Sequence, residues 1–212
     1  MKIMKTIIEK IDKNQKNTDI IREAGRILKE GGLVAFPTET VYGLGADALN
    51  EDAAKKIYAA KGRPSDNPLI IHITNMKALD KIVSEVPEKA VKVAEKYWPG
   101  PLTMIFNKSD IVPYGTTGGL DTVAVRMPVD EIAREVIDAG GGYIAAPSAN
   151  TSGRPSPTTA QHVAEDLTGR VDMIVDGGAV EIGVESTILD VTVEPPMILR
   201  PGAITKDRKS VV

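Results

Sequence analysis

The sequence contains no cysteine and only two histidines, His72 and His162, and these absences exclude several classes of protein. Without cysteine there is no disulfide framework, no thiolate-bound metal and no cysteine nucleophile. Two histidines are too few for a His-rich metal site, and a Ser-His-Asp triad would have to use one of them. Any chemistry performed by this chain must therefore depend on other side chains.

Long hydrophobic runs and an excess of positive charge are also absent. Residues 1–15 alternate charged and apolar side chains, and no later segment has the apolar length of a membrane span. The sequence therefore predicts a cytoplasmic protein that does not bind membranes. The formal net charge is −3, whereas a nucleic-acid-binding domain usually carries a basic excess. Any RNA binding is therefore expected to be weak and local.

The hydrophobic pattern predicts a mixed α/β protein. The length of 212 residues suits one large domain, and 42% apolar residues are enough for a core. Helices are predicted at residues 20–28, 51–60, 76–83, 87–98, 130–138 and 158–167, and strands at 6–11, 33–36, 69–73, 102–107, 122–126, 143–146, 171–175, 186–192 and 197–200. Residues 37–45 are expected to leave the preceding strand as a loop or irregular extension.

Several predicted strands follow each other without a helix between them, while others alternate with helices. This order favours one twisted sheet with both parallel and antiparallel strands, flanked by helices, over a purely parallel Rossmann sheet. No repeat, linker or low-complexity segment divides the chain. We therefore expect a single domain over residues 1–205, followed by a short polar tail over residues 206–212.

Three familiar motifs are missing or incomplete. The glycine-rich segment 115–119 is not followed by Lys-Ser or Lys-Thr, so it is not a P-loop. Residues 43–48 match the string G-x-G-x-x-A, but six residues separate them from the preceding strand, whereas a dinucleotide-binding turn follows its strand directly. Ser148 lacks the flanking glycines of a nucleophile elbow and is more typical of a turn cap.

Four other segments, each at a strand end or in a loop, carry candidate binding residues. They are Pro37–Gly45, Lys61–Leu69, Pro147–Gly153 and Glu185–Ile188, the last followed shortly by Leu199–Gly202. In the second segment, Lys61 and Arg63 lie two residues apart just after a helix. An ammonium and a planar guanidinium in this position suit a phosphate, although an exposed basic turn would look the same.

Two further arginines, Arg126 and Arg200, each end a hydrophobic strand. An arginine at such a position can reach the mouth of a sheet and bind a carboxylate, or it can form an ordinary salt bridge at the edge. Small hydroxyl side chains near the same loops could contact a phosphate, a ribose or a small amino acid, or cap turns; they are Thr38, Thr40, Ser148, Ser152, Ser156 and Ser186. His72 alone is typical of a core histidine, and His162 of an exposed helix face.

In the order of these segments, residues 20–203 closely resemble the YrdC family of threonylcarbamoyl-AMP synthases. The resemblance implies a nucleotidyltransferase that condenses L-threonine, bicarbonate and ATP into L-threonylcarbamoyl-AMP and pyrophosphate in a concave, cationic pocket. It also implies a tRNA-modifying transferase complex that receives the adenylate.

The resemblance assigns roles to individual residues. It implies that Thr40, with Thr38 adjacent, and His72, Arg126, Ala146 and Ser186 bind L-threonine. It implies that Arg63, Asn67, Thr122, Ser148, Ser156 and Arg200 bind ATP, and that Lys61 and Arg63 are catalytic cations close to the phosphates. His72, which alone looks like a core residue, becomes a pocket residue in this interpretation.

Such a reaction suits a chain without a protein nucleophile. The threonine amine captures bicarbonate or carbon dioxide to form a carbamate, and a carbamate oxygen attacks the α-phosphate as pyrophosphate leaves. The enzyme then needs positioning and positive charge more than acid–base groups. Lys61, Arg63 and Arg200 would supply that charge, together with Mg²⁺; no protein metal site is predicted.

Two other interpretations remain open. The first is an RNA-binding module of the same fold without catalysis. The second is a carbamoyl-adenylate enzyme of hydrogenase maturation, although such chains carry zinc-finger domains and no Cys-x-x-Cys is present here. Some family members also continue past the segment Leu199–Thr205 into a linker and a second domain. This chain stops at Val212, so we expect a short or truncated form, in which closure over the nucleotide would depend on that linker.

Overall fold

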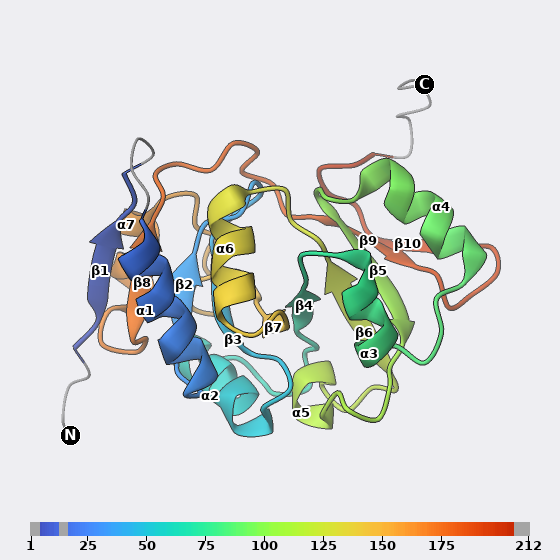
Figure 1. Cartoon of the computed structure of the whole chain (residues 1–212), viewed down its shortest axis with the longest axis horizontal. Helices are drawn as coiled ribbons and strands as arrows, with labels where there is room; N and C mark the ends of the chain where they lie inside the picture. The colour runs from blue at the N-terminus through green and yellow to red at the C-terminus, as the bar shows by residue number, and fades with distance from the viewer. Residues whose placement is uncertain (1–4, 13–16, 206–212) are drawn as a thin grey trace.

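The computed structural model describes residues 5–12 and 17–205, whose strands form one sheet (Figure 1). The strand order is β1-β8-β2-β3-β7-β4-β6-β5-β9-β10. Their bounds are β1 (Ile7–Lys10), β2 (Val34–Phe36), β3 (Gly43–Asp47), β4 (Ile70–His72), β5 (Leu102–Asn107), β6 (Thr122–Arg126), β7 (Ile144–Ala145), β8 (Met173–Asp176), β9 (Thr187–Asp190) and β10 (Met197–Arg200). Pairs such as β4–β6 are parallel and others such as β5–β6 are antiparallel, which confirms the predicted mixed sheet.

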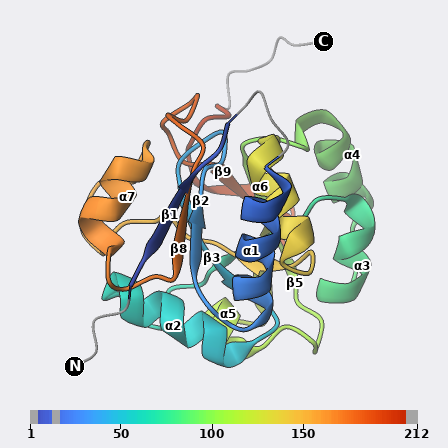
Figure 2. The ribbon, with the colours of Figure 1, turned by 60° about the vertical axis from the view of Figure 1, so that its left-hand side comes forward.

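The helices cover both faces of this sheet. They are α1 (Thr18–Lys29), α2 (Glu51–Lys61), α3 (Leu79–Ile82), α4 (Glu88–Tyr97), α5 (Tyr114–Thr117), α6 (Glu131–Ala139) and α7 (Ala160–Leu167), with a 3₁₀ turn at Met76–Ala78. Figure 2 shows α1 and α6 on one side of β1, β8 and β2, and α7 on the other side. In the described residues, no helix combines the length and the apolar character that crossing a membrane requires.

The alternation of side chains along β2 shows how the two faces are filled. Val34 and Phe36 pack with residues of α1 and α6, whereas Ala35 between them belongs to the larger core on the opposite face. All three residues are completely buried. Successive side chains of a strand point to opposite faces, so this central strand is apolar at every position, as a strand covered on both sides must be.

Helix α2 begins and ends at residues suited to those positions, and its end sets the direction of the Lys61–Arg63 segment. The side chain of Asn50 accepts hydrogen bonds from the N–H groups of Asp52 and Ala53, which is the usual role of an N-cap residue. Gly62 adopts a left-handed conformation with φ of 61°, and the N–H of Arg63 then bonds to the carbonyl of Tyr58. Lys61 and Arg63 therefore leave the helix in different directions.

Two local predictions were wrong, and one short helix was not predicted. Residues 37–45 are not entirely loop, because β3 begins at Gly43. Its glycines hide the strand pattern, and Gly45 is needed because a Cβ there would lie 2.6 Å from the Phe36 ring. The short helix α5 was missed, and the predicted helix at 76–83 is a 3₁₀ turn followed by one α-helical turn. The predicted tail at 206–212 lies outside the described residues.

Candidate functional site

A cavity of about 260 Å³ lies beside β4 and β6, between the loops that carry the four sequence segments. It contains nine of the residues predicted for the substrate sites: Thr40, Arg63, Asn67, His72, Arg126, Ala146, Ser148, Ser186 and Arg200. Thr38, Lys61, Thr122 and Ser156 do not line it. Segments that are far apart in the sequence therefore meet at one hollow, rather than on separate surfaces.

Arg63, Arg126 and Arg200 give the cavity its positive character, and Glu185 is the single carboxylate among the lining residues. The Arg63 guanidinium is half-buried and makes no hydrogen bond or ion pair within the described part of the chain. Burial lowers its pKa, although arginine remains charged in proteins. Arg63 is therefore a cation whose donors are open to a ligand.

Arg200 is held by two residues of the Glu185–Ile188 segment. Its Nη1 lies 2.6 Å from a carboxylate oxygen of Glu185, and its Nη2 donates to the main-chain carbonyl of Ser186 over 2.8 Å. The Ser156 hydroxyl donates to the other oxygen of Glu185 over 2.9 Å. Ser156 therefore reaches the cavity only through Glu185, which ties it to Arg200.

Arg126 lies deeper, at the end of β6, and is almost completely buried. Its Nη1 donates to the Thr40 hydroxyl over 2.8 Å, its Nε lies 3.4 Å from the Gly100 carbonyl, and its Nη2 lies 2.7 Å from a carboxylate oxygen of Glu39. The guanidinium is thus fixed from three directions. Thr38 does not reach the cavity, but its hydroxyl lies 2.9 Å from that of Thr40.

His72 is the neighbour of Arg126 in the parallel register of β4 and β6. Complete burial, reinforced by the positive charge of Arg126, lowers the pKa of His72 to about 3. The imidazole is therefore neutral at physiological pH. It can donate a hydrogen bond to a ligand in the cavity or accept one from it, but it adds no charge.

Lys61 lies behind the cavity wall. Its ammonium donates to the carbonyl oxygens of Ser148 and Asn150, and lies 3.5 Å from the side-chain oxygen of Asn150. Burial lowers the pKa of Lys61 to about 8. In this structure the lysine thus holds the loop that presents Ser148. Its catalytic role stays a prediction.

Thr122 occupies the first position of β6, on the same face as Ala124 and Arg126, which line the cavity. Thr122 therefore lies on the same face of β6 as the cavity, but beyond the residues that line it.

Glu39, Glu185 and Thr103 were not predicted as site residues. Glu39 and Glu185 belong to two of the four segments, and their positions between candidate ligands were the available signal. Thr103, whose hydroxyl lies 2.8 Å from that of Ser186, comes from β5 and carried no signal. In the described residues there is no cluster of three or more acidic or histidine side chains suited to a metal ion.

These features define a class of protein: a mixed α/β fold with a pocket lined by three arginines. The model of the Sua5/YciO/YrdC family, described as "Telomere recombination", matches residues 26–202. The chain belongs to this family.

Similar proteins carry a consistent name. The chain is 59% identical over 184 residues to the threonylcarbamoyl-AMP synthase of Pyrococcus abyssi, covering 87% of this chain and 54% of the relative. It is 51% identical to the threonylcarbamoyl-AMP synthase of Bacillus subtilis, covering 100% of this chain and 62% of that relative. It therefore spans between about half and three fifths of the length of these relatives.

A solved structure is also similar. The crystal structure of P. abyssi Sua5 complexed with L-threonine superposes with a TM-score of 0.86 at 56% identity, covering 94% of this chain and 57% of that one. This agreement supports the mixed sheet and the arrangement of its loops.

Proposed function

We propose that this chain condenses L-threonine, bicarbonate and ATP into L-threonylcarbamoyl-AMP and pyrophosphate. Family membership and the names of the relatives support this activity. The observation that carries it is the meeting of Arg63, Arg126 and Arg200 at one cavity with the hydroxyl groups of Ser148 and Ser186. Such a cavity suits a ligand with a carboxylate and a ligand with phosphates.

L-Threonine is proposed to bind at the buried end of the cavity. Arg126 would bind its carboxylate, since a guanidinium matches a carboxylate through two parallel hydrogen bonds. Thr40, His72, Ala146 and Ser186 line the same region. Thr40 is proposed as the direct ligand rather than Thr38, because Thr38 donates to the carbonyl of Val41 and supports Thr40 from behind.

ATP is proposed to bind at the more open end, where Arg63, Asn67, Ser148 and Arg200 line the cavity. Arg63, with open donors, and Arg200 would contact the phosphates. Ser156 and Thr122 lie just outside the hollow and would reach a nucleotide that extends beyond it. Lys61 would act close to the phosphates through the loop that it holds.

The chemistry follows from this placement. The neutral threonine amine and bicarbonate give a carbamate with loss of water. A carbamate oxygen then attacks the α-phosphorus, and the bond to the β-phosphate oxygen breaks to release pyrophosphate. Arg63 and Arg200 offset the negative charge that accumulates in this step, so positioning and electrostatics replace a protein nucleophile.

The described residues contain no cluster of acidic or histidine side chains that could bind Mg²⁺. Glu185, the one carboxylate that lines the cavity, is paired with Arg200. We therefore propose that Mg²⁺ arrives bound to the phosphates of ATP, as it commonly does.

The wider context is also a proposal. The adenylate would pass to a tRNA-modifying transferase complex in the cytoplasm, and direct RNA binding would be weak and local at a net charge of −3. The domain is proposed to extend to residue 205, with residues 206–212 as a tail.

The test is a mass-spectrometric assay of threonylcarbamoyl-AMP with ATP, L-threonine and bicarbonate. Arg63→Ala should lower product formation at least tenfold, equivalent to about 1.4 kcal/mol of transition-state stabilisation, while His162→Ala on the exposed face of α7 should not. Pyrophosphate release must depend on both threonine and bicarbonate. RNA binding without such turnover would instead favour the non-catalytic module, and full activity of Arg63→Ala would remove Arg63 from the phosphate site.

A further inference from the structure

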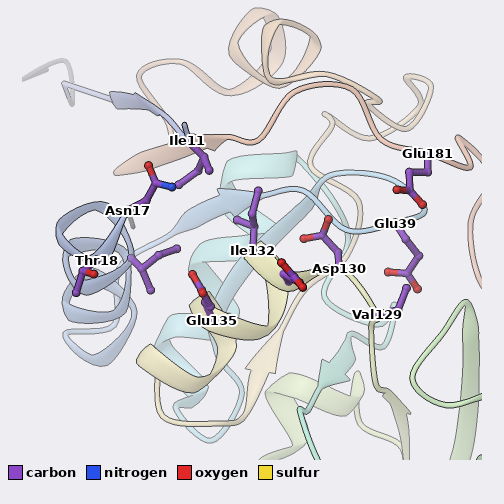
Figure 3. Close-up of a pocket in the computed structure, with 11 residues that line it drawn as sticks. Ile11, Asn17, Thr18, Glu39, Val129, Asp130, Ile132, Glu135 and Glu181 are labelled. Atoms are coloured by element: carbon purple, nitrogen blue, oxygen red, sulfur yellow. The ribbon is translucent and has the colours of Figure 1, made fainter. Parts of the chain in front are cut away.

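Glu39 and Arg126 form a buried ion pair whose two members face different cavities. Arg126 lines the cavity proposed to bind substrates. Glu39 does not; it lines a second cavity of about 670 Å³ (Figure 3). Glu39 therefore contacts Arg126 without lining the proposed substrate cavity.

The pair is isolated from water. Glu39 is 3% exposed and Arg126 is 4% exposed. Arg126 Nη2 lies 2.7 Å from Glu39 Oε1, yet Nη2 and both Glu39 oxygens make no well-directed hydrogen bond within the described residues. The contact is therefore held by charge rather than by hydrogen-bond geometry. Since an unpaired charge in this place would cost several kcal/mol, each member strongly restrains the other.

The second cavity is lined by several acidic side chains. Its lining includes the carboxylates of Glu39, Asp130, Glu131, Glu135 and Glu181, and none of its lining residues is a lysine or an arginine. In Figure 3 the side chains of Glu39, Asp130 and Glu181 lie around the same hollow. Of these carboxylates, Glu39 and then Asp130 favour the charged form of the Arg126 guanidinium, whereas Glu131, Glu135 and Glu181 are exposed to solvent.

The remaining contacts of Arg126 leave donors for one ligand. A guanidinium has five N–H groups. The Nε group faces Gly100, one Nη1 group donates to Thr40, and Nη2 faces Glu39. Each terminal nitrogen thus has one further N–H without a partner in the described part of the chain; that of Nη1 can meet a ligand directly, whereas Nη2 is itself buried.

We propose that Glu39 is a positioning residue that fixes Arg126 in the orientation needed to bind the carboxylate of L-threonine. This inference rests on the proposed function, since it assumes that Arg126 binds threonine. Glu39 touches no substrate and acts only through Arg126. Its loss should therefore weaken threonine binding without changing the nucleotide site.

The test compares Glu39→Gln with wild type in steady-state kinetics. The amide keeps the shape of the carboxylate but removes its charge. We expect the KM for L-threonine to rise at least tenfold, while the KM for ATP and the kcat at saturating threonine change less than twofold. Glu181→Gln, which alters an exposed carboxylate of the same cavity that makes no ion pair with Arg126 in the described structure, should match wild type.

A double variant separates positioning from general stability. If Glu39 acts through Arg126, Glu39→Gln added to Arg126→Lys should raise the KM for threonine no further than Arg126→Lys alone. If Glu39→Gln does not fold, Glu39→Asp keeps the charge at a longer distance and should raise the KM for threonine by a smaller factor, again without changing that for ATP.

Three results would overturn the inference. One is an unchanged KM for threonine in a folded Glu39 variant, and another is an equal rise for both substrates. The third is a wild-type chain that neither binds nor consumes threonine, which would also refute the proposed function. Threonine-dependent turnover in wild type with an unaffected Glu39 variant would refute only the role of Glu39.

Discussion

The ammonium nitrogen of Lys61 lies 2.6 Å from the main-chain carbonyl oxygen of Asn150. A second hydrogen bond joins the same two segments, because the N–H of Ser152 donates to the main-chain carbonyl of Lys61 over 2.8 Å. The end of α2 and the loop that follows β7 are therefore fastened together from both sides. The position of Ser148 in the cavity depends on this attachment.

Replacing Lys61 by methionine should release that loop. Lys61→Met leaves the carbonyls of Ser148 and Asn150 without their donor, and a buried polar group left unsatisfied costs about 1–3 kcal/mol. We expect the free energy of unfolding to fall by that amount and the Kd for ATP to rise at least tenfold, as measured by urea denaturation and calorimetry. Lys55→Met, on the exposed face of the same helix, should change stability by less than about 0.5 kcal/mol. Wild-type ATP affinity in Lys61→Met would show that the attachment is dispensable.

The affinity for ATP should depend on pH through the same lysine. The pKa of Lys61 is lowered to about 8 by burial, so its charge is lost as the pH rises through that value, well below the usual range of lysine. The phosphates of ATP are already ionised there, since the second phosphate pKa is about 6. The Kd for ATP should therefore increase between pH 7 and pH 10, approaching tenfold per pH unit above pH 8. A curve of the same slope in Lys61→Met would assign the titration to another group.

His72 should make the fold sensitive to acid. Its pKa is about 3 in the folded chain against about 6.5 when unfolded. Between these values the unfolded chain binds the extra proton, so stability falls as the pH decreases from 6.5 towards 3. The stability of wild type relative to His72→Gln should thus decline by about 1.4 kcal/mol per pH unit in urea titrations over this window. A stability difference between wild type and His72→Gln that stays constant over this pH window would contradict the prediction.

Gly25 should be essential to the packing of α1 on α6. A Cβ at this position would lie 2.6 Å from both the Cβ and the carbonyl oxygen of Ala139. Gly25→Ala should therefore push the two helices apart and lower the free energy of unfolding by about 1–3 kcal/mol, despite the better helix propensity of alanine. Lys29→Ala, exposed on the same helix, serves as the control. A Gly25→Ala protein as stable as wild type in urea would show that α1 can shift without cost.

Local patterns predicted the elements whose burial is periodic. Ala24, Ile27 and Leu28 are buried on one face of α1 as their spacing predicts. The pattern also predicted that Arg126 ends a hydrophobic strand, and its parallel neighbour His72 confirms that β4 and β6 end together. These predictions needed only the sequence within one element, whereas the placement of Arg126 at a pocket rather than in a salt bridge came from the family resemblance.

Long-range contacts could not be predicted in this way. The acceptors of Lys61 lie 87 and 89 residues away in the sequence. They are main-chain carbonyls, which every residue has, so the sequence does not identify them. The burial of Glu39 likewise depends on its ion pair with Arg126 at the end of β6, a residue far away in the sequence. β3 was not predicted because glycine has a low strand propensity. Gly45 is nevertheless required in this strand, since the Phe36 ring leaves no room for a side chain.

Glu185, between Ser156 and Arg200, has a consequence for how tightly the cavity can hold phosphate. Before any nucleotide arrives, this carboxylate already serves as an internal counter-ion for one of the three arginines. In the proposed function, an incoming phosphate would exchange partners with Glu185 instead of meeting an uncompensated cation. The net gain would be smaller than three guanidinium groups suggest, and the same carboxylate would take Arg200 back when pyrophosphate departs. Such an exchange would favour turnover over storage of a nucleotide.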